Sequence, residues 1–584
     1  MSPSDTLASR LIYLPQELRF GTSGRRGLVA DLTQLEVYTN VIGELEYLQS
    51  LAPEAGGVVR GDEFYFAYDL RPSSTAFVPG ENRRGEICQA VERGIEDAGM
   101  RPVNLGAIPT PALAYYAFSR AKGSIMVTGS HIPFDRNGYK LNTSRGELLK
   151  EHEDPINQAV RQVRERLSAQ AFSESLFDET GMFKQGHRDL GPASEDAGAA
   201  YLRRYQAFFE GCSLAGKCIV VYQHSAVGRD LLVELLRHFG AEAIPAGRSS
   251  TFVPIDTENI GAAQLAAIQE LADQAGVHHK LDAVVSLDGD SDRPLLLGIE
   301  SGTGKARFFG GDLVGMIAAQ YLGADSVVVP ISCNDAIDRF ELSKVVEPKT
   351  RIGSPYVIRG MRAAREKGRR AVCGWEANGG FLTGSDITRK GCVLEALPTR
   401  DAVLPLLCAL FAAAGKNISL VDLFASLPAR YSKAALLQQF PRSTGLRLVA
   451  CYTPENAAIR DVNFSGAEAT AWDEDRSRIE LSAEAAQQIA AIRRKLGVFF
   501  SSAVGPEPIT RLNYTDGVRI AFANGDVAHF RPSGNADEFR IYAVADSQER
   551  ADFIAEAATR ADGILRRMAG ELEVGTEIGG RRGT

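Results

Sequence analysis

Val127-Thr-Gly-Ser-His-Ile-Pro-Phe-Asp-Arg-Asn-Gly-Tyr-Lys140 is the stretch of sequence on which the fold prediction depends. The apolar residues 125–127 predict a short strand, and the Gly, Pro and Asn-Gly that follow predict a loop on both sides of Ser130. In α/β domains, ligand sites lie beyond the carboxyl ends of the strands. We therefore predict an α/β fold whose loop exposes the Ser130 hydroxyl as a nucleophile. Because Ile132 stands where the nucleophile elbow of a hydrolase requires glycine, the loop favours phosphate chemistry over acyl transfer.

A second loop, Leu287-Asp-Gly-Asp-Ser-Asp-Arg-Pro294, also follows an apolar strand and carries three alternating aspartates. One tight loop can turn their carboxylates toward a single point, where their mutual repulsion is costly without a cation between them. Ligands that are all oxygen atoms indicate magnesium. An EF-hand is excluded because its loop needs glycine and glutamate where this chain has Arg293 and Ile299. The predicted metal ligands are Asp288, Asp290 and Asp292.

The composition is that of a protein with several domains that acts on a small molecule. The chain has 584 residues, of which 45% are hydrophobic and 24% charged, and a formal net charge of -8. It has no clustered run of Lys and Arg, which argues against nucleic-acid or membrane-surface binding. No segment reaches about 18 consecutive apolar residues, and residues 1–10 lack the pattern of a signal peptide, so we expect a cytoplasmic protein. The eight cysteines form no CxxC pair, which indicates reduced thiols and no zinc site.

Short apolar runs alternate with helical patterns over most of the chain, which predicts successive α/β domains. The expected strands are 64–68, 125–127, 218–222, 283–287, 326–330 and 371–373, and the expected helices are 87–98, 193–209, 229–239, 312–321 and 356–367. Beyond about residue 427, paired strands 517–522 and 527–530 with an Asn-Gly hairpin signal, strand 539–544 and a helix from 548 to about 568 predict an α+β domain. The predicted division is domain I at 1–192, domain II at 193–309, domain III at 310–428, domain IV at 429–570 and a disordered tail at 571–584.

Three further loops combine charged groups with glycine. In Gly374-Trp-Glu-Ala-Asn-Gly-Gly380 a carboxylate could accept two sugar hydroxyls, although a plain Gly-rich turn is the alternative. Phe530-Arg-Pro-Ser-Gly-Asn-Ala-Asp-Glu-Phe-Arg-Ile-Tyr542 is typical of a phosphate site, with a hairpin carrying incidental arginines as the alternative. Phe20-Gly-Thr-Ser-Gly-Arg-Arg-Gly27 fits a phosphate site or a turn equally well, and Asp69-Leu-Arg-Pro-Ser-Ser74 resembles a turn that could support it.

Taken in order, these loops resemble those of the α-D-phosphohexomutase superfamily, which includes phosphomannomutases, phosphoglucomutases and phosphoglucosamine mutases. The resemblance spans residues 20–542. It implies an α/β protein of four domains, three in tandem and a C-terminal α+β domain, around a central cleft. It also implies a monomeric or dimeric enzyme that interconverts hexose 1-phosphate and hexose 6-phosphate through a phosphoserine and a hexose 1,6-bisphosphate. We expect mannose phosphate as the substrate ahead of glucose phosphate.

The resemblance also implies roles for individual residues. Ser130 looks like the phosphorylated serine, and with the three aspartates it would hold Mg2+. Arg26 matches an arginine of the first loop, and Lys140 and His131 match candidate acids or bases. The implied substrate-binding residues are Arg293, Glu376 and Asn378, with Arg531, Ser533, Gly534, Asn535 and Arg540 at a distal phosphate site.

Three loops depart from the pattern common in that superfamily. The serine loop there commonly reads Ala-Ser-His-Asn-Pro, whereas this chain has Gly129 and Ile132. The sugar loop commonly reads Glu-x-Ser-Gly-His, whereas Asn378 and Gly380 stand here, and Asp537 adds a negative charge to the distal loop. The alternatives that stay open are a phosphoglucosamine mutase, a metal-dependent sugar phosphatase and a non-catalytic protein that binds sugar phosphates.

Overall fold

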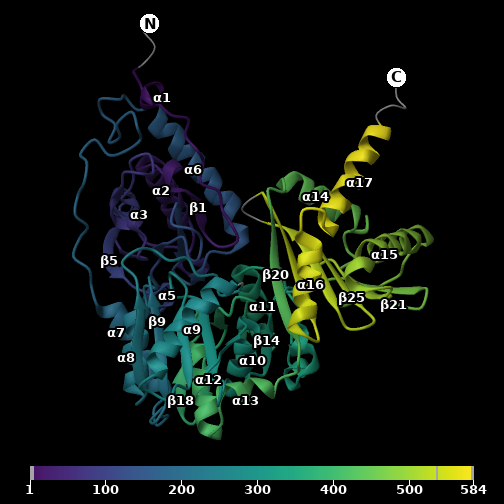
Figure 1. Ribbon diagram of the computed structural model, residues 1–584. Helices are drawn as coiled ribbons and strands as arrows, with labels where there is room; N and C mark the ends of the chain where they lie inside the picture. The colour runs from purple at the N-terminus through teal and green to yellow at the C-terminus, as the bar shows by residue number, and fades with distance from the viewer. Residues whose placement is uncertain (1–4, 259, 534–536, 580–584) are drawn as a thin grey trace. The chain divides into compact units, whose positions relative to one another are not determined.

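A computed structural model describes residues 5–258, 260–533 and 537–579, with side chains up to Glu571. The chain divides into two compact units (Figure 1). Unit 1 consists of residues 1–325 and 361–424, and unit 2 consists of residues 326–360 and 425–584. The predicted boundaries of the four domains stay a prediction. Among the described residues, no helix is long and apolar enough to cross a membrane.

The first sheet of unit 1 carries the serine loop. Its order is β1-β7-β6-β2-β5, where β1 is Arg25–Leu28, and β8 (Gly146–Glu147) pairs with β7. Strands β2 (Glu63–Tyr68), β5 (Arg101–Ala107) and β6 (Ser124–Val127) are parallel, and β7 (Arg136–Thr143) returns antiparallel to β6. Helices α2 (Gln34–Ser50), α4 (Ile87–Asp97) and α6 (Glu153–Ser168) pack beside it. The serine loop is therefore the turn between β6 and β7, at the carboxyl end of a fully buried strand.

The second sheet carries the aspartate loop in the same way. Its order is β10-β9-β11-β12-β13. Strands β9 (Cys218–His224), β10 (Glu242–Arg248) and β11 (Ala283–Leu287) are parallel, whereas β12 (Pro294–Ile299) and β13 (Ala306–Phe309) are antiparallel. Helices α7 (Asp196–Phe208), α8 (Arg229–His238) and α9 (Ala262–Gly276) accompany these strands. Every residue of β11 is buried, as its uninterrupted Ala-Val-Val-Ser-Leu sequence predicts.

The sugar loop lies between two further strands of unit 1. Strand β15 (Val372–Trp375) pairs antiparallel with β16 (Phe381–Thr383), which pairs with β19 (Leu397–Asp401). Helices α10 (Gly311–Leu322) and α12 (Val403–Lys416) pack against each other beside these strands. The expected helix at 356–367 is α11 (Ser354–Glu366), and the expected strand at 326–330 is the shorter β14 (Ser326–Val328). The α/β alternation predicted from the sequence is thus confirmed.

Unit 2 contains the predicted α+β fold. Its eight-stranded sheet has the order β20-β27-β26-β25-β24-β21-β22-β23. Four of these strands are β21 (Asp461–Ser465), β22 (Glu468–Trp472), β23 (Arg478–Ile479) and β24 (Ile509–Asn513). The expected hairpin consists of β25 (Val518–Phe522) and β26 (Val527–Pro532), which pair antiparallel, and Gly525 has the positive φ of 87° that its turn requires. Strand β27 (Glu538–Ala545) lies between β26 and β20 (Tyr431–Gln438). Helix α16 (Gln548–Thr559) packs on β20 and β27 (Figure 1).

The C-terminal region differs from its prediction in two ways. The single helix expected over 548–568 is two helices, α16 and α17 (Ile564–Gly579). They are separated at Gly563, where a Cβ atom would lie only 2.7 Å from the carbonyl oxygen of Ala558. The tail expected to be disordered from 571 continues α17 as far as residue 579. Its Gly and charged residues suggested disorder, but Glu and Leu are also good helix formers.

Candidate active site

Ser130 is buried, which corrects the expectation of an exposed hydroxyl. Its side chain has no solvent exposure, and its backbone has the left-handed φ of 56°. The Ser130 N–H donates to Thr128 Oγ1 at 2.7 Å, and the Ser130 Oγ donates to Asp288 Oδ2 at 2.9 Å. The aspartate loop covers the serine loop so closely that a Cβ atom at Gly289 would lie 2.6 Å from the Ser130 carbonyl oxygen. The sequence could not show this cover because it comes from a loop of another sheet.

Arg71 holds the serine loop in shape, and the sequence analysis did not select it. Its guanidinium donates to the carbonyl oxygens of Ser130 at 2.9 Å, Pro133 at 2.7 Å and Arg136 at 2.9 Å, and also to that of Ile132. Asp69 pairs with it at 3.2 Å. The turn at 69–74 therefore supports the serine loop, and its expected support of the loop at 20–27 stays a prediction. Arginine suits this role because its guanidinium presents several N–H groups in a fixed fork.

The three aspartates form a buried cluster, as predicted. Asp288, Asp290 and Asp292 each offer an oxygen, and these oxygens lie within 4.8 Å of one another. Asp290 Oδ1 and Asp292 Oδ1 are buried without a hydrogen-bond partner among the described residues. Buried carboxylate oxygens that lack a donor are costly unless a cation faces them. The cluster therefore fits a hard divalent cation such as Mg2+, which prefers oxygen ligands.

Lys140 lies against this cluster. Its Nζ donates to Asp290 Oδ2 and to Asp292 Oδ2, both at 2.6 Å, and Thr110 Oγ1 donates to the same Asp290 oxygen at 2.5 Å. Burial and the charges of its two neighbours raise the pKa of Asp288 well above its ordinary value. Burial acts in the same direction on Asp290, but the charge and the hydrogen bond of Lys140 outweigh it and lower the pKa of Asp290. The aspartates of the cluster thus differ in their tendency to bind a proton, and a bound cation would reduce this difference.

The remaining residues predicted near the serine also gather there. His131 Nδ1 accepts from Arg293 Nη1 at 2.8 Å and lies 3.4 Å from Ser130 Oγ. Arg293 Nε lies 3.6 Å from Asp292 Oδ1. Burial lowers the pKa of the Arg26 guanidinium to about 10, an effect that the charge of Asp290 opposes. Its neighbour Arg25 is instead structural, because it is bonded to Glu44 and Asn157 inside the first domain.

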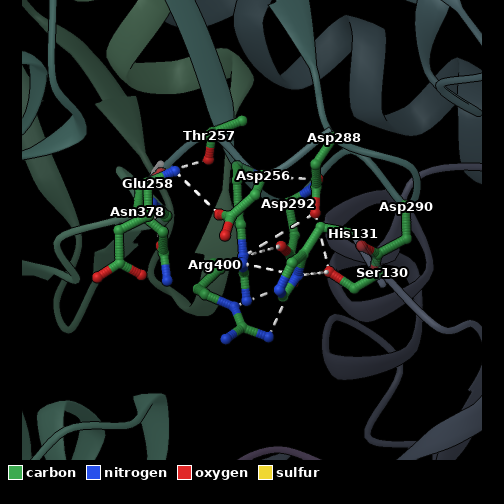
Figure 2. A network of polar contacts seen from close by, with 12 residues as sticks. Ser130, His131, Asp256, Thr257, Glu258, Asp288, Asp290, Asp292, Asn378 and Arg400 are labelled. Atoms are coloured by element: carbon green, nitrogen blue, oxygen red, sulfur yellow. Dashed lines mark hydrogen bonds and ion pairs between the residues drawn. The ribbon is translucent and has the colours of Figure 1, made fainter. Parts of the chain in front are cut away.

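The predicted sugar loop is a tight turn with both of its polar residues buried. Glu376 is 4% exposed and Asn378 is 6% exposed. The Gly379 N–H donates to the Glu376 carbonyl at 2.8 Å, and the Gly380 N–H donates to Asn378 Oδ1 at 3.0 Å. Thr257 Oγ1 donates to the Asn378 carbonyl at 2.9 Å (Figure 2). Asn378 thus shapes the loop through its own amide oxygen.

Arg400 joins the sugar loop to the aspartate loop, and the sequence analysis missed it. Its Nε donates to Asp292 Oδ2 at 3.0 Å, and its Nη1 donates to Glu376 Oε2 at 3.0 Å. In Figure 2 it lies between the aspartates and Asn378. The one signal in the sequence was a charged Arg-Asp pair directly before an apolar helical run. Charged groups at such a position must find partners when they are buried.

The predicted distal site lies in unit 2. Arg531 and Arg540 are directly opposite each other on β26 and β27, and Ser533 is 5% exposed. Like charges in such a cross-strand pair repel, and a bound anion relieves the repulsion. Arg531 Nε donates to Asp516 Oδ1 at 3.0 Å. The other two predicted residues of this site, Gly534 and Asn535, lie outside the described residues.

Asp537 has a structural role that its charge did not suggest. Its Oδ1 accepts from the backbone N–H of Arg442 at 2.9 Å, at the beginning of α14 (Arg442–Cys451). The positive end of that helix stabilises a carboxylate at this position. The negative charge of Asp537 is therefore partly compensated.

Known proteins resemble this chain over nearly its whole length. The family "Phosphoglucomutase/phosphomannomutase" matches with its alpha/beta/alpha domain I at residues 17–167 and its alpha/beta/alpha domain III at residues 310–431. A phosphomannomutase of Salmonella muenchen is 35% identical over 92% of this chain and 94% of its own length. A phosphomannomutase of Sinorhizobium fredii is 34% identical over 92% of this chain and 97% of its own.

Solved structures show the same fold. Two are crystal structures of an Aspergillus fumigatus enzyme that acts as an N-acetylphosphoglucosamine mutase, one with glucose 1,6-bisphosphate and the other with GlcNAc-6P and magnesium. Their TM-scores are 0.53 and 0.51, and each is 15% identical and covers 98% of this chain. The first is covered over 98% of its length and the second over 99%.

Proposed function

The chain belongs to the phosphoglucomutase/phosphomannomutase family of α-D-phosphohexomutases, and from this premise we propose that it interconverts mannose 1-phosphate and mannose 6-phosphate. It is a phosphotransferase of the mutase type. The observation that carries the proposal is the 2.9 Å hydrogen bond from Ser130 Oγ to Asp288 in a buried acidic cluster. Mannose is preferred because the two phosphomannomutases align over more than nine tenths of this chain.

In the proposed first half-reaction, a free hydroxyl of the hexose phosphate attacks the phosphorus of phosphorylated Ser130. A bond from the sugar oxygen to phosphorus forms, the bond to Ser130 Oγ breaks, and a hexose 1,6-bisphosphate results. The hydroxyl proton passes to a protein base, with Lys140 and His131 as the candidates. In the second half-reaction Ser130 Oγ takes the other phosphoryl group, and the product regains a free hydroxyl. One nucleophile thus serves both halves.

We propose that Asp288, Asp290 and Asp292 hold Mg2+ together with an oxygen of the Ser130 phosphate. A bound Mg2+ would offset the negative charge on the transferring phosphoryl oxygens. Arg26 and Arg293 add fixed positive charge near the same oxygens, because both are close to the aspartate cluster. Charge that is already in position costs no reorganisation when the reaction occurs.

An exchange of phosphates also requires a second anion site for the end that is not reacting. We assign this role to Arg531, Ser533, Gly534, Asn535 and Arg540. The two arginines offer bidentate donors that match phosphate geometry. Glu376 and Asn378 would hold the sugar hydroxyls, because a buried carboxylate discriminates strongly against a ligand that leaves it unpaired.

We further propose that the enzyme acts in the cytoplasm on hexose phosphates. None of the eight cysteines, all of which the structure describes, forms a disulfide, as expected in a reducing compartment. Whether it is a monomer or a dimer stays a prediction.

The deciding experiment compares mannose, glucose and glucosamine 1-phosphates with the purified protein, Mg2+ and a trace of the matching bisphosphate. We expect the 6-phosphate isomer to form fastest from mannose 1-phosphate, with little inorganic phosphate released. Release of phosphate without isomer would identify a phosphatase instead. A preference for glucosamine 1-phosphate would identify a phosphoglucosamine mutase, and no turnover of any sugar would leave a non-catalytic binding protein.

A further inference from the structure

We propose that Arg400 is a positioning residue that makes Mg2+ binding and sugar binding depend on each other. The proposal rests on the proposed function, because it assigns the aspartate cluster to Mg2+ and Glu376 to the sugar. Arg400 touches neither ligand in this assignment. It acts through one carboxylate on each side.

Arg400 contacts one oxygen of each of these two carboxylates and leaves the other oxygen for a ligand. Its guanidinium engages Asp292 through Oδ2, with Nε at 3.0 Å and Nη2 at 2.9 Å, whereas Asp292 Oδ1 has no hydrogen-bond partner among the described residues. On the other side, Nη1 engages Oε2 of Glu376 at 3.0 Å. The second oxygen of each carboxylate is thereby aimed at its own ligand, Mg2+ for Asp292 and a sugar hydroxyl for Glu376. A carboxylate that is held by a fixed second partner binds its ligand in one orientation.

The space that Arg400 occupies is available only because residue 380 is glycine. A Cβ atom at Gly380 would lie 2.6 Å from Cδ of Arg400 and 2.7 Å from its Cγ. Side chains at both positions would overlap, so a sugar loop that ends in a larger residue excludes this arginine. In this chain the arginine from β19 fills the place next to Glu376 that a side chain at 380 would otherwise fill.

The backbone that carries Arg400 is held firmly. Its neighbour Asp401 is buried, accepts from Tyr201 at 2.7 Å and from Tyr205, and accepts from the N–H of Val403 at the beginning of α12. On the other side, Thr399 Oγ1 donates to Glu147 at 2.5 Å. Arg400 itself is 3% exposed. Because the residues on both sides of Arg400 are held, its guanidinium has little freedom to follow one carboxylate when that carboxylate moves. A shift of the carboxylate at one ligand site therefore alters the carboxylate at the other.

The test measures the coupling directly. The dissociation constant of Mn2+, used as a probe for Mg2+, is determined by electron paramagnetic resonance with and without saturating mannose 1-phosphate. In the unaltered enzyme we expect the sugar phosphate to tighten Mn2+ binding several-fold. In Arg400→Met the Mn2+ dissociation constant should rise about 10- to 100-fold, as for loss of other residues that orient a metal ligand. The effect of the sugar phosphate on it should disappear.

Two variants separate positioning from general damage. Arg400→Lys retains the positive charge but has no fork, so it should keep Mn2+ binding within about 10-fold of the unaltered enzyme while losing the coupling. Arg84→Met is the control, because Arg84 is also a buried arginine of unit 1, but it donates to the backbone carbonyl of Thr180 and lies over the ring of Tyr13. It should leave both Mn2+ binding and the coupling unchanged.

The proposal is overturned if Arg400→Met or Arg400→Lys, folded as judged by circular dichroism, shows the same coupling as the unaltered enzyme. It is also overturned if the unaltered enzyme shows no coupling. Failure of the proposed function gives a different result, namely no turnover of hexose phosphates by the unaltered enzyme. Because Mn2+ and sugar-phosphate binding are measured without turnover, the two failures are distinguished.

Discussion

Ser130 Oγ donates a hydrogen bond of 2.9 Å to Asp288 Oδ2, although the two residues are 158 positions apart in the chain. Each residue lies at the end of a buried strand of a different sheet, β6 or β11. The nucleophile and the acidic cluster therefore form one site only when both sheets are folded and packed together. This relationship makes the roles of the two loops testable separately.

Ser130→Ala should abolish interconversion of hexose 1- and 6-phosphates and leave the fold intact. The change removes only the Oγ atom, which contacts Asp288 and His131, so no packing is lost. Isomer formation and the circular dichroism spectrum are the measurements. Intact mass should show a phosphate on the unaltered enzyme and none on the variant, with Ser250→Ala, an exposed serine, as the control. Undiminished turnover by Ser130→Ala would refute the phosphoserine mechanism.

Removal of divalent cations with EDTA should abolish activity, and Mg2+ should restore it. Because the cation binds a cluster that exists only in the folded protein, Mg2+ at 100 times its dissociation constant should stabilise the fold by about 2.7 kcal/mol. Asp290→Asn should greatly reduce this stabilisation, measured as the shift in Tm with added Mg2+. Asp282→Asn, outside the cluster, is the control and should keep the full shift. A shift of normal size in Asp290→Asn would contradict the assignment of this residue as a ligand.

Arg71→Lys should weaken the serine loop. A lysine ammonium cannot reach the four carbonyl oxygens that the Arg71 fork engages, and each lost charged hydrogen bond costs about 1.5–3 kcal/mol. We expect kcat to fall by about 100-fold with a smaller change in KM, and proteolytic cleavage near residues 130–136 to become faster. Arg93→Lys, a half-buried arginine paired with Asp97 on α4, should behave like the unaltered enzyme. If kcat does not change, the loop does not depend on this grip.

Stability should fall with pH below about 6.5 because of two buried histidines. Burial lowers the pKa of His224 and that of His529 to about 4 from the ordinary 6.5. Between these values the unfolded state binds more protons than the folded state, so the contribution is complete above pH 6.5 and is lost as the pH falls to 4. From pH 6.5 to pH 5 each histidine should cost about 2 kcal/mol of the free energy of unfolding. Urea unfolding at both pH values measures this.

His529→Gln should remove its share of that pH dependence. Gln can still donate to the Asp516 carbonyl, which His529 Nε2 contacts at 2.6 Å, but it does not titrate. His278→Gln is the control, because the His278 ring is exposed. An unchanged difference between pH 6.5 and pH 5 in His529→Gln would show that this ring is not the source.

Arg531→Ala should raise KM much more than it lowers kcat. Loss of a charged hydrogen bond to the non-reacting phosphate costs about 1.5–3 kcal/mol, which corresponds to a rise in KM of about 10- to 100-fold. Steady-state kinetics with mannose 1-phosphate is the measurement. Arg511→Ala removes an arginine of the same sheet that pairs with Asp461, and it should leave KM unchanged. A KM equal to that of the unaltered enzyme in Arg531→Ala would remove the distal-site assignment.

The serine and the aspartate triplet were predictable because their signals are local. A buried strand followed at once by a polar loop is visible within about ten residues of sequence, and it placed both Ser130 and Asp288 correctly. The hairpin of unit 2 was predictable for the same reason, since its Asn-Gly turn determines which residues pair.

Arg71 and Arg400 were not predictable because their partners are distant in sequence. Arg400 bonds Asp292, 108 positions away, and Arg71 bonds carbonyl oxygens 59–65 positions away. The burial of Ser130 was missed for the same reason, as its cover comes from the aspartate loop. The prediction of helix ends was wrong where the composition is misleading. The Gly and charged residues of α17, for example, suggested disorder.

Unit 1 is built from two separate segments of the chain, so parts of its active site are synthesised at different times. Unit 1 includes residues 361–424, which are synthesised after residues 326–360 of unit 2. While translation is in progress, Ser130 and Asp292 leave the ribosome well before Arg400, the residue that bonds the Asp292 carboxylate in the finished protein. A messenger truncated before codon 400 would therefore yield a polypeptide whose Asp292 carboxylate keeps Lys140 as a partner but lacks Arg400, and chaperones and proteases would act on such an unfinished chain.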